Sequence, residues 1–219
     1  GTFKDCNFDL GLLKWGCTTL LQAADRLEID DPLIPVWKDI LARSVDYPVD
    51  EYGFRLGADK TSPSNHRHGS HFIAAYPLYM VNIEQEGTEE LLAATLERFR
   101  EAPGYPGMRV AYSGPLAAAL GYGDTALEEL KDLAGDLHPN GLWFRSPCLE
   151  VSLSVANVVQ EMLIQSWGDK IRVFPAMPEA WADVEFHDLR TEGAFLVSAQ
   201  RVGGKAQWVK VKSLAGEPC

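Results

Sequence analysis

The chain has 219 residues, enough for one domain and part of a second. Hydrophobic residues make up 46% and charged residues 23%, a composition typical of globular proteins. The net charge of −11 argues against nucleic acid as a partner, because binding phosphates requires a basic surface. No run of about 20 apolar residues is present, so we expect no membrane insertion.

The first part of the chain is expected to be helical. Apolar residues recur at steps of three and four over residues 9–28, which predicts one long helix that Asp5 or Asn7 could cap. Pro32 then opens a second helix that ends near Ser44. Because the link between them is short, we expect the two helices to be antiparallel.

Shorter elements follow along the chain. Residues 52–57 favour a short strand, and residues 59–65 a loop. We expect a helix over residues 72–81, in which Pro77 causes a kink or a break. Further helices are expected from Thr88 onward and over residues 115–120 and 125–137.

The last helix covers residues 150–166 and is apolar on most sides, which predicts deep packing. After Gly168 the apolar residues alternate, as in strands. The expected strands are residues 171–174, 184–186, 194–199 and 207–211, with Gly203-Gly204 as a hairpin turn. Helical hairpins followed by antiparallel strands are therefore the predicted order.

Three imidazoles and one guanidinium lie within residues 65–71, directly before an apolar run. One interpretation is a polar surface loop at a helix start. Zinc ligation is a second, but the intervals between His66, His68 and His71 do not match the usual helical spacing, and Arg67 would repel a cation. A third is a pocket whose directional donors hold a neutral, hydroxyl-rich ligand or an anion.

A second candidate site is Glu150, which heads the late apolar helix. A carboxylate in the first turn of a helix is stabilised in its ionised form and can act as a general base if it reaches a water. It can equally be a capping residue. Glu161, farther along the same helix, more easily forms a surface salt bridge. Four aromatic residues could stack on a sugar or instead belong to the core: Tyr76, Tyr79, Trp143 and Trp167. Arg145 and Arg172 could contact a ligand or instead form surface ion pairs.

The cysteines carry no site motif. Cys6, Cys17, Cys148 and Cys219 form no CxxC pair, so neither a zinc knuckle nor a thioredoxin-like site is indicated. We expect Cys6 and Cys17 to be small core residues. We expect no metal and no cofactor.

Three segments resemble a known family in the same order along the chain. The run His66-Arg67-His68-Gly69-Ser70-His71, followed by Tyr76-Pro77, resembles the HRHxSH…YP motif of glycoside hydrolase family 95. A second match begins with residues 161–166, which are similar to the family's EMLLQS helix. It continues through residues 171–181, which are similar to the family's LPALP-x-AW entry into a C-terminal β-domain. Residues 7–9 resemble the start of the helix that follows the family's acid-bearing segment.

The resemblance implies a mainly α fold. Residues 1–168 would be the later half of an (α/α)6 toroid of antiparallel helix pairs, and residues 169–219 the start of a β-sandwich. The family hydrolyses terminal α-linked fucose with inversion. Arg67 and His68 match sugar-contacting positions, and we expect His66 and His71 to contribute to substrate binding.

Glu150 falls where the family usually has the Asp of an IDGNFG segment, which helps to activate water; here Leu149-Glu150-Val151-Ser152 replaces that context. The resemblance places the general acid upstream of the first helix, in a missing part of the same polypeptide. Because inverting hydrolysis needs two carboxyls about 6.5–9.5 Å apart, we expect this chain alone to be an inactive fragment.

The implied substrate is an oligosaccharide or polysaccharide with terminal α-L-fucosyl-like residues. Two alternatives stay open. The chain could be a non-catalytic carbohydrate-binding or scaffold toroid. It could also belong to another toroid enzyme, such as a polysaccharide lyase in which His68 and Arg67 serve as base and charge neutraliser.

Overall fold

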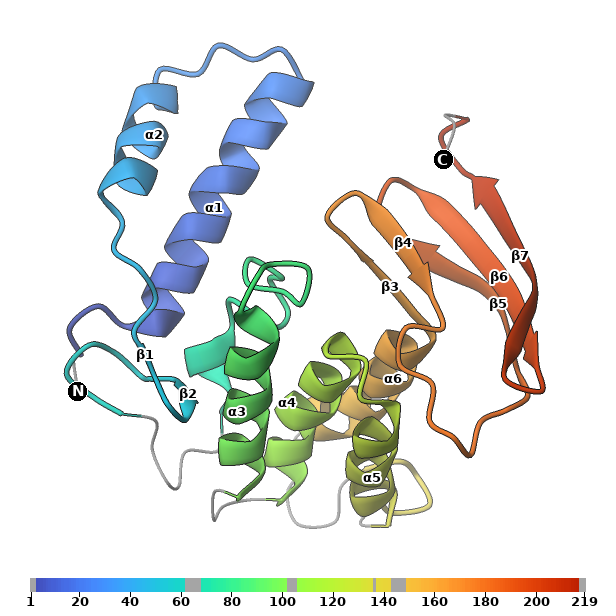
Figure 1. The fold of residues 1–219 in the computed structure, drawn as a ribbon. Coiled ribbons are helices and arrows are strands. Elements are labelled where there is room, and N and C mark those ends of the chain that lie inside the picture. The colour runs from blue at the N-terminus through green and yellow to red at the C-terminus, as the bar shows by residue number, and fades with distance from the viewer. Residues whose placement is uncertain (1–2, 62–67, 102–105, 136, 143–148, 217–219) are drawn as a thin grey trace. The chain divides into compact units, whose positions relative to one another are not determined.

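The computed structural model describes residues 3–61, 68–101, 106–135, 137–142 and 149–216. They form helices interspersed with and followed by small antiparallel sheets (Figure 1). The chain divides into two compact units, residues 1–104 and residues 105–219. The predicted domain boundary between residues 168 and 169 falls within the second unit, at the turn between strands β3 and β4.

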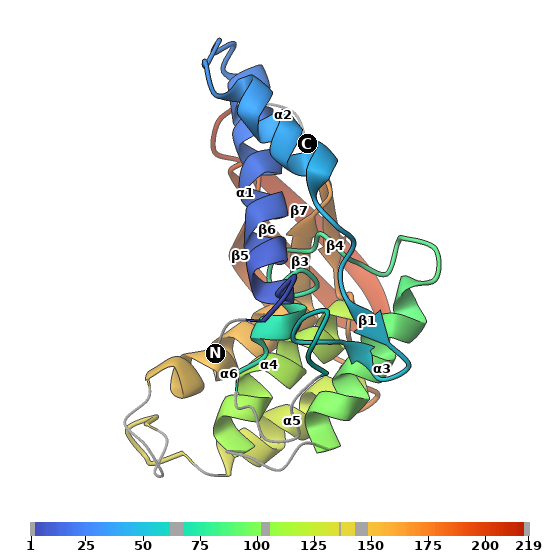
Figure 2. The same ribbon diagram turned by 90° about the vertical axis from the view of Figure 1, so that its left-hand side faces the viewer.

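The first unit begins with the predicted helical hairpin. Helix α1 (Asn7–Arg26) and helix α2 (Ile34–Arg43) run side by side in opposite directions (Figures 1 and 2). The second helix begins two residues later than expected, with Leu33 as its N-cap. The hairpin leaves large apolar side chains exposed, among them Leu13, Trp15, Leu20, Leu33 and Val36.

The remaining elements of the first unit are short except for one helix. Strands β1 (Val49–Asp50) and β2 (Gly53–Phe54) form a small antiparallel ladder. The segment after it contains the 3-10 helix η1 (Ser70–Phe72), and helix α3 (Thr88–Glu101) follows. Thr88 is the start predicted for that helix.

The helix expected over residues 72–81 does not form. Its chain leaves helical geometry after η1 and continues as turns. Pro77 has no N–H to donate and disfavours helical geometry in the preceding residue, so the apolar run cannot continue as a helix. The apolar residues of this run nevertheless indicate burial correctly at three positions, because Phe72, Ala74 and Tyr76 lie in the core.

Three helices build the core of the second unit: α4 (Pro106–Ala119), α5 (Gly123–Ala134) and α6 (Leu149–Leu163). Met108, Val110, Leu133 and Val151 form one buried cluster between them. Helix α4 starts nine residues before the predicted position, and Pro115 lies inside it. The expectation that α6 is deeply packed is wrong for one face, because Leu153 is 68% exposed.

Two antiparallel sheets follow the helices. Strands β3 (Ile164–Trp167) and β4 (Lys170–Val173) pair as a hairpin, so the last predicted helix ends at Leu163 and not at residue 166. Strands β5 (Val184–Thr191), β6 (Phe195–Val202) and β7 (Lys205–Ser213) form a meander in that order. The predicted strands are confirmed, as is the Gly203-Gly204 turn, where both residues have positive φ.

One face of the meander supplies a second core. Ile164, Phe186, Val197 and Ala199 are its buried members. Within the described residues, no helix is long and apolar enough to cross a membrane.

Candidate functional site

The structure places only part of the predicted histidine cluster. His66 and Arg67 lie outside the described residues, as do Trp143 and Arg145. His68 is half-buried and lies two residues before η1, next to the N-cap Gly69. The grouping of these side chains around a sugar stays a prediction.

His71 lies in an aromatic environment. It is only 2% exposed, and its ring centroid is 4.9 Å from that of Phe72 and 5.8 Å from that of Phe99. Phe72 and Phe99 also meet edge to face, with centroids 5.1 Å apart. These rings join η1 to α3, and a contact between His71 and substrate stays a prediction.

Glu150 lies where the sequence predicts it, in the first turn of α6. Its residue is exposed, so the carboxylate is open to solvent. The N-terminal end of a helix favours the ionised form of a carboxylate. The location therefore meets the two local requirements of a general base, negative charge and access to water.

The charge of Glu150 affects the pKa of Tyr112 on α4. Burial raises the pKa of the Tyr112 hydroxyl above its ordinary value of 10.0, and the negative charge of Glu150 raises it further. The ring packs against the cluster of Met108, Val110, Leu133 and Val151. The phenol thus stays protonated at neutral pH and can donate a hydrogen bond near the carboxylate. No motif or spacing in the sequence marks Tyr112 as a site residue.

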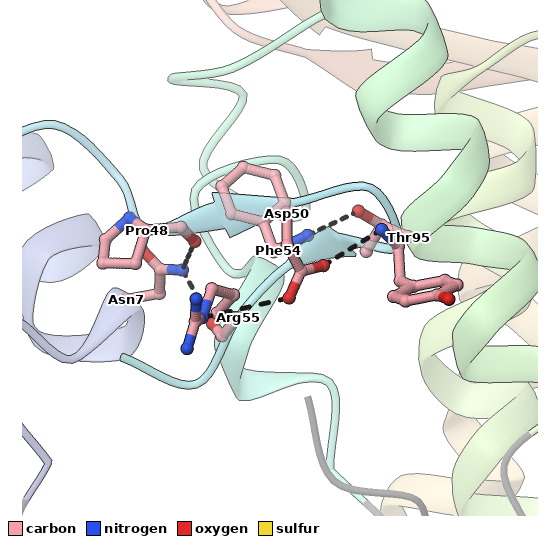
Figure 3. A network of polar contacts seen from close by, with 7 residues as sticks. Asn7, Pro48, Asp50, Phe54, Arg55 and Thr95 are labelled. Atoms are coloured by element: carbon pink, nitrogen blue, oxygen red, sulfur yellow. Dashed lines mark hydrogen bonds and ion pairs between the residues drawn. The ribbon is translucent and has the colours of Figure 1, made fainter. Parts of the chain in front are cut away.

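The segment that leads to the histidine run is held to α1 by Asn7. This residue is fully buried, and its Nδ2 donates hydrogen bonds of 2.7 Å to the carbonyl oxygens of both Pro48 and Arg55 (Figure 3). Its backbone N–H donates to the carbonyl of Leu56 at 3.0 Å. The expectation that Asp5 or Asn7 caps α1 is wrong: the N-cap is Cys6, with no side-chain hydrogen bond.

The same segment is held to α3 by Thr95. The backbone N–H of Phe54 donates to Thr95 Oγ1 at 3.0 Å (Figure 3), and the Thr95 hydroxyl donates to the carbonyl of Leu91 at 2.7 Å. Gly53 has a φ of +102°, and a side chain there would overlap Thr95. Within the same segment, Arg55 forms an ion pair with Asp50, with Nε 3.9 Å from Oδ2.

Residues 161–166, which resemble the family's EMLLQS helix, connect helices α4 and α6 to strand β3. Gln165 of β3 is buried, and its Nε2 donates to the carbonyl oxygens of Ala118 at 2.9 Å and Glu161 at 3.0 Å. Its Oε1 accepts a hydrogen bond of 3.1 Å from Trp167 Nε1. Trp167, one of the aromatic candidates for ligand contact, is buried. The Cζ of the Arg172 guanidinium lies over its ring, 3.2 Å from the ring centroid.

Residues 171–181, which complete the second match of the resemblance, pack against the start of α5. A Cβ at Gly123 would lie 2.6 Å from Pro178 N and overlap Met177 C. The backbone N–H of Glu179 donates to Asp124 Oδ1 at 3.0 Å. These contacts, like those of Gln165, give the motif residues structural roles within the second unit.

Two further predicted aromatic residues lie together. The rings of Tyr76 and Tyr79 meet edge to face with centroids 5.9 Å apart. Among the residues that the structure describes, no three His, Cys, Asp or Glu side chains are arranged to hold a metal ion. The sequence matches no protein-family profile and no curated protein.

Proposed function

We propose that this chain contributes to an inverting, exo-acting glycoside hydrolase that cleaves terminal α-L-fucosyl-like residues, with Glu150 as the base. The observation that carries the proposal is the exposed carboxylate in the first turn of α6. A water bound there loses its proton to Glu150 while its oxygen attacks the anomeric carbon. Tyr112, kept protonated, donates to Glu150 or to the sugar.

The toroid architecture is part of the same proposal. The antiparallel hairpin of α1 and α2 supports this part of the proposal. In such a ring each hairpin packs against neighbours on both sides. The exposed apolar side chains of α1 and α2 support further helical contacts of this kind. Arg67 and His68 would hold the sugar, as the resemblance implies, and we expect His66 and His71 to contribute to the same site.

The proposal requires a second carboxyl as general acid, which the resemblance assigns to an upstream segment. We therefore expect the 219-residue chain to leave 4-nitrophenyl α-L-fucoside uncleaved, and a polypeptide that includes the upstream segment to cleave it. In that polypeptide, Glu150→Gln abolishes turnover and preserves fucose binding, because the amide keeps the shape but cannot take a proton.

Glu161→Gln is the comparison on the same helix and leaves turnover intact. Turnover by the 219-residue chain alone, or unchanged turnover in the Glu150→Gln variant, would reject this assignment of the base. Sugar binding without turnover in the extended polypeptide would favour a non-catalytic carbohydrate-binding protein. Unsaturated products would favour a lyase.

A further inference from the structure

The face of the meander opposite its apolar core carries an exposed tryptophan. Trp208 on β7 is paired with Gln200 on β6, and Gln200 with Glu185 on β5, so the three side chains form one row across the sheet. The residues of the next row, Phe186, Ala199 and Val209, point to the other face, where Phe186 and Ala199 are buried. Trp208 is 37% exposed and does not belong to that core.

Hydrogen bonds orient this row. Trp208 Nε1 donates to Gln200 Oε1 at 3.1 Å, and Gln200 Nε2 donates to Glu185 Oε2 at 2.7 Å. His187 Nε2 lies 2.9 Å from Glu185 Oε1, and the rings of His187 and Trp208 have centroids 6.2 Å apart. Because each side chain is held by its neighbour, little conformational entropy remains to be lost when a ligand binds.

We propose that this row of Glu185, Gln200 and Trp208, together with the adjacent His187, is a binding surface for a neutral pyranose of an oligosaccharide. The electron-rich face of an indole attracts the slightly positive C–H face of a sugar ring. Glu185 can accept further hydrogen bonds from sugar hydroxyls, and Gln200 has a second N–H to donate. These groups lie beside the indole, as recognition of a hydroxylated ring requires.

Charge favours a neutral ligand. Lys210 occupies the next outward position on β7, opposite Ser198, whose hydroxyl donates to Asp188 Oδ1 at 3.4 Å, so charges of both signs lie beside the row. Nucleic acid is disfavoured by the net charge of −11. The inference does not depend on the hydrolysis proposed for Glu150, because it concerns a different element and involves no chemical step.

The test is a titration of the 219-residue chain with cellotetraose, xylotetraose and lactose, and with tetragalacturonate as an anionic comparison. The indole N–H signal of each tryptophan is followed by NMR, which needs no variant. We expect saturable shifts confined to the Trp208 signal and its sheet neighbours with at least one neutral probe, and weaker binding of the anion.

The variants are Trp208→Ala, Trp208→Phe and, as a matched control, Trp15→Ala, which removes a tryptophan that is 42% exposed on α1. Trp208→Ala weakens binding roughly tenfold or more, as expected for loss of the ring contact. Trp208→Phe retains most of the affinity, and Trp15→Ala retains all of it. The absence of a shift at Trp208 with every neutral probe, or equal affinity in a folded Trp208→Ala variant, would overturn the inference.

Discussion

The side-chain amide of Asn7 donates a 2.7 Å hydrogen bond to the carbonyl oxygen of Arg55, 48 residues later in the chain. The same nitrogen donates to Pro48. Asn7 thereby holds the segment before the histidine run against the start of α1.

Replacing Asn7 should destabilise the fold. Asn7→Ala removes the donor of two backbone carbonyls, and we expect unfolding by urea to show a loss of about 2 kcal/mol or more. Asn7→Asp, nearly the same size, should cost at least as much, because it places carboxylate oxygens against carbonyl oxygens. Gln22→Ala removes an exposed amide from the same helix and should change stability by less than about 0.5 kcal/mol. Equal stabilities of Asn7→Ala and Gln22→Ala would contradict this role.

Gly53 should resist substitution for two reasons. Gly53→Ala combines an unfavourable positive φ with overlap against Thr95, and we expect a loss of more than about 2 kcal/mol. Gly87 is the matched control because it also has a positive φ, of +73°, but no atom within 4 Å of an added Cβ. Gly87→Ala should therefore show only the backbone cost, about 1–2 kcal/mol. The difference between the two variants in denaturant unfolding measures the steric part, and a difference of zero would exclude it.

A similar comparison tests the contact between α5 and the linker after β4. Gly123→Ala would push the backbone of Met177 and Pro178 away from the helix, and we expect a loss of about 1–3 kcal/mol. Gly135→Ala, at the other end of α5, meets its nearest atom at an ordinary 3.6 Å and should be nearly neutral. Hydrogen exchange should show faster opening of the Glu179 amide in Gly123→Ala alone. An unchanged exchange rate there would mean that the linker does not depend on this packing.

The pKa of Tyr112 can be used to test whether Glu150 lies close to its hydroxyl. Glu150→Gln removes the negative charge near the phenol, so the pKa of Tyr112 should fall, yet stay above 10.0 because burial remains the larger cause. Ultraviolet difference titration of the tyrosinate, compared between wild type, Glu150→Gln and Tyr112→Phe, isolates this group. A pKa of Tyr112 that does not move in Glu150→Gln would show that the carboxylate does not lie within electrostatic reach.

Alkaline pH should weaken the fold through Tyr47 and Tyr112. Burial raises the pKa of both hydroxyls in the folded chain, so the folded state retains protons that the unfolded state releases. Their contribution to stability is therefore complete below the unfolded pKa of about 10 and is lost as pH rises through the folded pKa. Between pH 9 and pH 11, the free energy of unfolding should decline less steeply with pH in Tyr47→Phe and in Tyr112→Phe than in the wild type. Tyr52→Phe removes an exposed hydroxyl and is the control. Identical slopes in all four proteins would refute the linkage.

Periodicity predicted most elements correctly. The helical stripe of residues 9–28 and the alternation after Gly168 correspond to α1 and to strands β4–β7. It failed where an apolar run is compatible with more than one structure. Most of residues 72–76 are buried but do not form the predicted α-helix, and residues 164–167 pair with β4 and are not the end of α6. For the candidate site, Glu150 was placed correctly in its helix, whereas Tyr112 carried no local signal.

The sequence alone determines most of the helical and extended segments and the turn at Gly203-Gly204, because these choices depend on neighbours within one or two turns. Only the tertiary structure decides that Asn7 binds two distant carbonyls and does not cap its helix, and that His71 lies among Phe72 and Phe99. The partners of a buried polar or aromatic side chain come from remote parts of the chain, and packing alone brings them together.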